Sequence, residues 1–195
     1  MRTATIERKT KETDIQLSVN LDGSGQYQIE TGVGFFDHML TQIAVHGLFD
    51  LNVKAVGDLQ IDAHHTVEDC GLALGAAFRQ ALGDKAGIVR TASVTVPMDE
   101  ALGQVVVDFS GRPYSVLTTK WNGSEVGGLP VTLLEHFFES FATASAANLH
   151  LIVQYGRDNH HMAEALFKAM ARALSMAVTV DPRRSGTIPS SKGVL

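Results

Sequence analysis

The sequence contains little cysteine, no long apolar run and no large net charge, and each absence excludes a class of protein. The single cysteine among 195 residues excludes an internal disulfide framework and Cys-rich zinc or iron–sulfur sites, and it fits a reducing compartment. No apolar run is long enough to span a bilayer. The N-terminus also lacks the apolar segment of a signal peptide. We therefore expect a soluble cytoplasmic protein.

Composition narrows the class further. With 45% apolar and 19% charged residues, the chain is neither disordered nor collagen-like. At this length it can bury roughly 70% of its unfolded surface, so it needs no disulfide or zinc to fold. A net charge of −5 gives no sign of nucleic-acid or membrane-surface binding. The chain contains eight histidines but only one cysteine. Imidazole and carboxylate groups must therefore supply any metal ligands.

A repeated motif divides the chain into two halves. Residues 62–69 and 158–165 share the pattern Asp-x-His-His-x-x-Glu. An acid–histidine pair precedes each motif at a similar distance, and a glutamate followed eleven residues later by glycine precedes each pair. Three matching elements in the same order indicate an internal duplication. We predict half-repeats at 1–90 and 91–180 and a tail at 181–195, within one compact unit.

The hydrophobic periodicity predicts an α+β fold with the same element order in each half. In the first half we expect strands at 15–21, near 29 and at 51–56, and helices at 35–46 and 65–82. In the second half we expect strands near 92–96, 104–109, 115–119 and 149–153, and helices at 131–144 and 161–178. This order favours a mostly antiparallel sheet with helices packed on one face. It leaves open whether the halves pack helix face to helix face or back to back.

The two motifs supply clustered metal ligands. Each opens a predicted helix, where residues three or four apart share a face, so two imidazoles lie near one carboxylate. Adjacent histidines point about 100° apart and favour two different metals over chelation of one. One His-His pair alone is more often a polar helix start, but two copies in register favour metal binding. With one upstream histidine per half, the candidate ligands are His38, His64, His65, Glu68, His136, His160, His161 and Glu164. They suffice for two metals with three histidines and one carboxylate each, a set that suits zinc, manganese, iron or nickel.

Further polar residues are candidates for holding a substrate. His46 and Gln42 fall on roughly the helix face of His38, where His46 could line a site or merely cap the helix end, whereas His150, in an apolar strand, is expected to be structural. Arginine suits bidentate phosphate capture, and the tail adds hydroxyl, ammonium and accessible backbone N–H groups. Each of these cations alone is typical of a solvated surface, but together they could form a phosphate pocket. The candidate pocket residues are Arg90, Arg112, Ser190 and Lys192.

The chain resembles the imidazoleglycerol-phosphate dehydratase family over nearly its whole length. The segments that carry the resemblance are RKTKETDI, LDGSG, TGVGFFDHML, DAHHTVEDCGLALG, DFSGRPY, EHFFESF, GRDNHHMAEALFKA and GTIPSSKGVL. The resemblance implies duplicated βαβ-type units of the ribosomal protein S5 domain 2-like class. It implies two manganese ions per active site on the eight ligands above, phosphate capture by the pocket residues, and an ordered tail. It also implies a 24-subunit homo-oligomer with active sites between subunits, in a monofunctional form.

The resemblance further implies a lyase of histidine biosynthesis that dehydrates imidazole glycerol phosphate to imidazole acetol phosphate. Metal ions on the substrate's imidazole nitrogens would stabilise an imidazolate, which could expel the adjacent hydroxyl through a diazafulvene-like intermediate. Glu12 is the candidate acid–base residue, and a metal-bound water near Glu164 or Glu68 could share its work. No nucleic-acid or membrane partner is expected. A different dinuclear enzyme such as a hydrolase stays open, as does a non-enzymatic metal-binding shell, although phosphate-type cations disfavour the latter.

Overall fold

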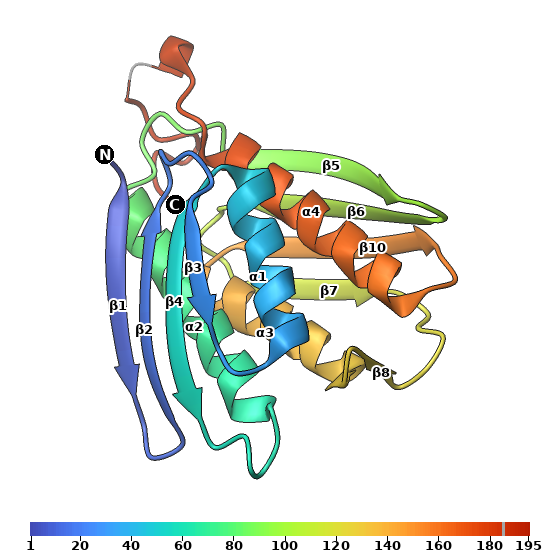
Figure 1. Ribbon diagram of the computed structural model, residues 1–195. Coiled ribbons are helices and arrows are strands. Elements are labelled where there is room, and N and C mark those ends of the chain that lie inside the picture. The colour runs from blue at the N-terminus through green and yellow to red at the C-terminus, as the bar shows by residue number, and fades with distance from the viewer. Residues whose placement is uncertain (185) are drawn as a thin grey trace.

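The computed structural model describes residues 1–184 and 186–195 and shows two similar halves (Figure 1). The first half comprises β1 (Thr3–Lys9), β2 (Thr13–Asn20), β3 (Tyr27–Glu30), α1 (Gly34–Gly47), β4 (Asp50–Gly57) and α2 (His64–Leu82). The second half comprises β5 (Thr91–Met98), β6 (Ala101–Asp108), β7 (Tyr114–Thr118), β8 (Glu125–Val126), β9 (Leu129–Pro130), α3 (Val131–Ser145), β10 (Asn148–Tyr155) and α4 (Asn159–Val178). A single 3₁₀ turn, Pro182–Arg184, opens the tail.

Each half forms a four-stranded sheet of the same topology. The strand orders are β1-β2-β4-β3 and β5-β6-β10-β7. In the first sheet β2 pairs antiparallel with β1 and β4, whereas β3 and β4 are parallel. In the second sheet β6 pairs antiparallel with β5 and β10, whereas β7 and β10 are parallel. Because α1 and α3 connect the parallel strands, each half contains a βαβ unit. The predicted α+β class with duplicated βαβ-type halves is confirmed.

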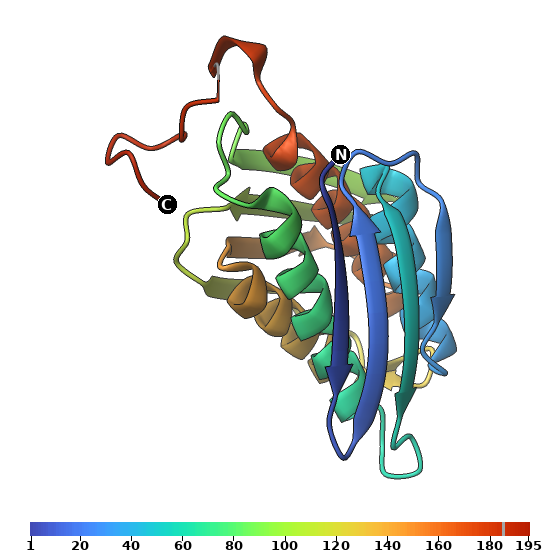
Figure 2. The same cartoon turned by 90° about the vertical axis from the view of Figure 1, so that its left-hand side faces the viewer.

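The four helices lie between the two sheets, as Figures 1 and 2 show from two directions. Helix α2 packs on the first sheet and on α3, while α4 packs on the second sheet and on α1. A Cβ atom added at Gly75 would lie 2.5 Å from the backbone oxygen of Phe141, so α2 and α3 approach almost backbone to backbone. The halves therefore pack helix face to helix face, the arrangement that the element order leaves open.

The sequence pattern does not predict β1, the edge strand of the first sheet. Its inward-facing positions are Ala4, Ile6 and Arg8, and the arginine pairs with the buried Asp69 (NH2 to Oδ1, 2.7 Å). A charged side chain at an inward position ends the apolar alternation after two residues, so the segment reads as polar. The duplication offers the missing signal, because the predicted strand at 92–96 requires a counterpart in the first half.

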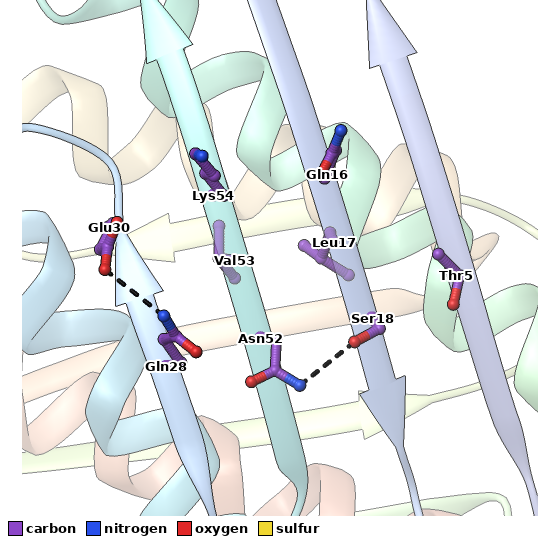
Figure 3. Close-up of a pocket in the computed structure, with 9 residues that line it drawn as sticks. All are labelled: Thr5, Gln16, Leu17, Ser18, Gln28, Glu30, Asn52, Val53 and Lys54. Carbon is purple, nitrogen blue, oxygen red and sulfur yellow. Dashed lines mark hydrogen bonds between the residues drawn. The ribbon is translucent and has the colours of Figure 1, made fainter.

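The outer face of the first sheet carries mostly polar side chains. Thr5, Ser18, Asn52 and Gln28 lie opposite one another across the first sheet, and Asn52 Nδ2 donates to Ser18 Oγ at 3.3 Å (Figure 3). They line a shallow pocket of about 340 Å³ that contains no histidine. The predicted metal ligands therefore lie elsewhere, at the ends of the helices.

Candidate active site

The aspartate of each repeated motif accepts a backbone N–H group at the start of the helix that carries its histidines, Asp158 as the N-cap of α4 and Asp62 from one residue before the N-cap of α2. Asp62 Oδ1 accepts the backbone N–H of His64 at 2.7 Å, and Asp158 Oδ1 accepts that of His160 at 2.7 Å. A carboxylate here satisfies N–H groups that have no partner within the helix. The motif thus places a capping carboxylate next to candidate ligands on the first helical turn, and the cap fixes the backbone position of the two histidines.

One group of ligands joins α1 to α4, and we call His38, His160 and Glu164 the α1–α4 cluster. The Nε2 atoms of His38 and His160 lie 3.2 and 3.1 Å from Glu164 Oε2. Phe35 packs edge-on against both imidazole rings, with its centroid 6.5 Å from that of His38 and 5.3 Å from that of His160. The three ligand atoms are close enough to bind one cation.

The Glu164 carboxylate is held in its ionised form. Burial would raise the pKa of this carboxyl, but hydrogen bonds from Lys168 and His38 outweigh burial and hold the pKa at about 2. Lys168 Nζ lies 2.7 Å from Glu164 Oε1, leaving Oε2 to the histidines. Lys168 is not among the residues predicted from the sequence, although its i,i+4 spacing from Glu164 on the predicted helix could have identified it.

A second group joins α2 to α3, and we call His64, Glu68 and His136 the α2–α3 cluster. Glu68 Oε2 lies 3.6 Å from the Nε2 atom of His64 and 3.4 Å from that of His136. Although the His136 Nε2 atom is buried, it makes no hydrogen bond within the described part of the chain. A buried nitrogen aimed at a carboxylate without a hydrogen bond fits a metal ligand.

Each cluster combines the two halves of the duplication. The upstream histidine of one half meets the His-x-x-x-Glu pair of the other, because α1 packs on α4 and α2 packs on α3. The structure thus brings six of the eight predicted ligands together in two sets of three. The pairing could not be predicted from the sequence, since it depends on how the halves pack.

The remaining two predicted ligands, His65 and His161, lie outside both clusters. His65 Nδ1 is 3.0 Å from Asp58 Oδ2, and its Nε2 is 3.8 Å from Glu12 Oε1. His161 Nδ1 is 2.7 Å from Glu100 Oε2. Hydrogen bonding to Asp58 raises the pKa of His65, and hydrogen bonding to Glu100 raises that of His161. The second histidine of each motif therefore points away from the ligands of its own chain, as the 100° rotation between adjacent residues predicts.

The predicted phosphate residues line one cavity of about 430 Å³, which the last residues of the tail form with Arg90 and the turn after β6. Arg90, Arg112, Ser190 and Lys192 all border it. Arg90 donates to Asp108 Oδ1 through Nε at 2.6 Å and to the Pro189 carbonyl through NH1 at 2.9 Å. Arg90 therefore also holds the tail in place, a role that the sequence does not indicate.

Comparison with known proteins assigns the family. The family model described as imidazoleglycerol-phosphate dehydratase matches residues 31–174. Curated relatives with that name include those of Gluconacetobacter diazotrophicus, 56% identical over 100% of this chain and 98% of the relative, and Roseiflexus sp., 57% identical over the same shares. The chain belongs to the imidazoleglycerol-phosphate dehydratase family. It is a hydro-lyase of a dehydration step in histidine biosynthesis.

Solved imidazoleglycerol-phosphate dehydratases share the fold. The Staphylococcus aureus enzyme aligns with a TM-score of 0.83 at 35% identity, covering 92% of this chain and 99% of that one. The Pyrococcus furiosus enzyme, solved in complex with (S)-C348, aligns with a TM-score of 0.85 at 35% identity, covering 97% and 100%. No helix of the described residues is long and apolar enough to cross a membrane.

Gln42 lies beside the α1–α4 cluster, and His46 lies in the last turn of α1. Gln42 is buried, with Nε2 3.4 Å from His38 Nδ1. His46 borders a cavity of about 410 Å³ together with Lys168 and Arg172. Burial and these two cations lower the pKa of His46. His150 lies in β10, where its Nε2 is 2.9 Å from Asn148 Oδ1, and it belongs to neither cluster.

The tail cavity and the α1–α4 cluster lie at opposite ends of helix α4. The Arg90 N–H donates to the carbonyl of Ala177, near the end of α4, whereas Glu164 lies near its beginning. The helix rise separates these two α4 residues by about 20 Å. With bonds of about 1.5 Å, an imidazole carrying a three-carbon phosphate chain reaches only about 9 Å. One small substrate therefore cannot touch both places on one chain.

Proposed function

We propose that this chain dehydrates imidazole glycerol phosphate to imidazole acetol phosphate at manganese sites shared between copies of itself. The observation that carries the metal dependence is the pair of His-His-Glu clusters, one of which includes a buried imidazole nitrogen without a hydrogen bond. Nitrogen and oxygen donors without thiolate suit Mn²⁺ among other divalent metals. Two ions per site would have as ligands the six cluster residues together with His65 and His161.

The separation of the tail cavity from the clusters supports a shared site. His65 and His161 lie outside the clusters of their own chain, and the tail cavity is about 20 Å from the α1–α4 cluster along α4. Copies that exchange these parts would complete three-histidine, one-carboxylate sites next to a phosphate pocket. The assembly of 24 subunits and the cytoplasmic location stay predictions from the family resemblance and the composition.

Binding and orientation come from the chain's own residues. Arg112 and Lys192 would bind the substrate phosphate with charge-assisted hydrogen bonds, while Ser190 adds a hydroxyl and Arg90 fixes the tail that carries them. Anchoring the phosphate away from the reacting carbons restricts the substrate to one orientation. Gln42 and His46 would border the substrate from the side of α1.

Glu12 is the proposed acid–base residue. Its carboxylate is exposed and lies 3.8 Å from the Nε2 atom of His65, a proposed metal ligand, and within the described residues it forms no ion pair with lysine or arginine. When bound, the metals would stabilise the ionised imidazole of the substrate as Lewis acids. Glu12 in its protonated form would donate a proton to the departing hydroxyl, which leaves as water, and the resulting carboxylate would accept a proton from the neighbouring carbon. Glu164, held ionised by Lys168, would serve as a ligand, and its share in proton transfer stays a prediction.

A metal analysis combined with a dehydratase assay tests this proposal. We expect two Mn²⁺ per chain, loss of turnover after chelation, and recovery when Mn²⁺ is restored. Glu12→Gln should lower kcat by about 10²–10⁴-fold while the metal content stays at two per chain. Full turnover in metal-free protein would refute the metal dependence, and a wild-type kcat for Glu12→Gln would refute the acid–base role.

A further inference from the structure

We propose that Asp58 and Glu100 are positioning residues, which hold His65 and His161 by Nδ1 so that the Nε2 atom of each is presented to a metal bound mainly by another copy. The inference deepens the proposed function and rests on its shared metal sites. It concerns residues that do not touch substrate or metal themselves. Two observations support it: the carboxylate contacts at Nδ1 and the solvent exposure of the acids near Nε2.

The contact at Nδ1 decides which nitrogen is free to bind a cation. A carboxylate can only accept here, so Nδ1 carries the proton, and in the neutral imidazole Nε2 keeps its lone pair. Both Asp58 oxygens lie 3.0–3.1 Å from His65 Nδ1, and Glu100 Oε2 lies 2.7 Å from His161 Nδ1. Such carboxylate–imidazole pairs orient histidine ligands and raise their basicity in metal sites.

Exposure differs between the two sides of each ring. The carboxylates at Nδ1 are the less exposed partners, with 18% of the Asp58 side chain and 22% of that of Glu100 accessible. The acids nearest Nε2 are open to solvent, with 54% of Glu12 and 74% of Asp99 accessible. The Nε2 atoms therefore face the outside of the chain, where a second copy can reach them.

The two halves reach the same geometry with different residues. Glu100 lies in the turn between β5 and β6, and by the duplication its counterpart is Glu12 in the turn between β1 and β2. In the first half, however, Asp58 after β4 takes the Nδ1 contact and leaves Glu12 beside Nε2. Recurrence of the contact from a different position supports its role in orientation, and it frees Glu12 for acid–base work.

Asp58 gives the cleaner test, because its side chain bonds only to His65 among the described residues, whereas Glu100 also accepts the backbone N–H groups of Arg157 and Asp158. Asp58→Ala removes the acceptor, and Asp58→Asn keeps an oxygen that can accept from Nδ1. Asp14→Asn is the matched control, since Asp14 pairs with Lys9 and contacts no imidazole. Mn²⁺ binding to the intact protein is followed by the electron paramagnetic resonance signal of free Mn²⁺.

We expect Asp58→Ala to lower the affinity for one of the two Mn²⁺ ions per chain by about 10–100-fold. Asp58→Asn should lower this affinity less, and Asp14→Asn should bind both ions as the wild type does. Circular dichroism of the metal-free proteins verifies that all variants fold alike. Wild-type affinity for both ions in Asp58→Ala, or equal losses in the alanine and asparagine variants, would overturn the positioning role. Absence of Mn²⁺ binding in the wild type would instead refute the proposed function, so the two failures are distinguishable.

Discussion

Mixing two inactive variants tests whether the active site is assembled from different copies. Arg112→Ala removes a cation of the tail cavity, and His38→Ala removes a ligand of the α1–α4 cluster. Because cavity and cluster are about 20 Å apart along α4, a substrate of about 9 Å needs Arg112 from one chain and His38 from another. Each variant alone should have no measurable dehydration, since every site in its assembly lacks the same group.

In a randomly mixed assembly, half of the sites have an intact His38 and half have an intact Arg112. When the two residues come from different chains, these choices are independent, and about one quarter of the sites contain both. Equal co-expression of two differently tagged variants, followed by two affinity steps, yields mixed assemblies. We expect these to regain about a quarter of the wild-type turnover per site, and to require Mn²⁺ for it.

A second mixture provides the control. His38 and Glu164 belong to one cluster of one chain, so mixing His38→Ala with Glu164→Ala leaves every such cluster with one defect. This mixture should stay inactive although its subunits are equally mixed. If the mixture of Arg112→Ala and His38→Ala also stays inactive while containing both chains, the shared site is refuted.

Three further predictions concern stability and binding. Gly75→Ala should lower the free energy of unfolding by about 1–3 kcal/mol in urea titrations, because its Cβ would lie 2.5 Å from a backbone oxygen of α3, whereas Gly34→Ala, with nothing within 4 Å, should change it little. The folded-state pKa of Glu164, about 2, lies below its ordinary 4.5, so its ionisation stabilises the metal-free fold above pH 4.5 and this contribution is lost as the pH falls toward 2; in Lys168→Met the folded-state pKa should rise toward 4.5, so unfolding titrations should show a smaller loss of stability over this pH range. Deleting residues 190–195 should raise KM by about tenfold or more, through lost charge-assisted bonds, while the melting temperature stays that of the full chain.

Local patterns predicted most of the fold because they act within single elements. The apolar spacing places all four helices within one or two residues of their observed ends, since helix boundaries depend on nearby residues such as the Asp158 cap. The prediction failed for β1, where Arg8 faces inward to meet Asp69 from a different helix. It also failed for the short β8–β9 hairpin, although its Gly127-Gly128 turn is a hairpin signal.

The site was predicted as a set of residue types, but its pairing required the tertiary structure. The ligand count depends only on the repeated motif, whereas the meeting of His38 with Glu164 depends on α1 packing against α4. The contact of Asp58 with His65 lies outside the repeated ligand pattern and depends on the tertiary structure, whereas the i,i+4 spacing of Glu164 and Lys168 is visible in the sequence. Sequence duplication thus indicates what the site contains, and the packing of helix faces decides which groups share a cation.

A sequence difference between the two halves makes the two clusters unequal in charge. In the α1–α4 cluster, Lys168 neutralises the largely buried Glu164. The equivalent position four residues after Glu68 is Leu72, and 36% of the Glu68 side chain is exposed. The charge of Glu164 is therefore balanced by a lysine on its own helix, whereas Glu68 has a leucine at the equivalent position, although both glutamates belong to the repeated motif. Duplication followed by such local divergence gives one chain two candidate metal sites with similar side chains but different net charge, and metals bound there would not need to share one task.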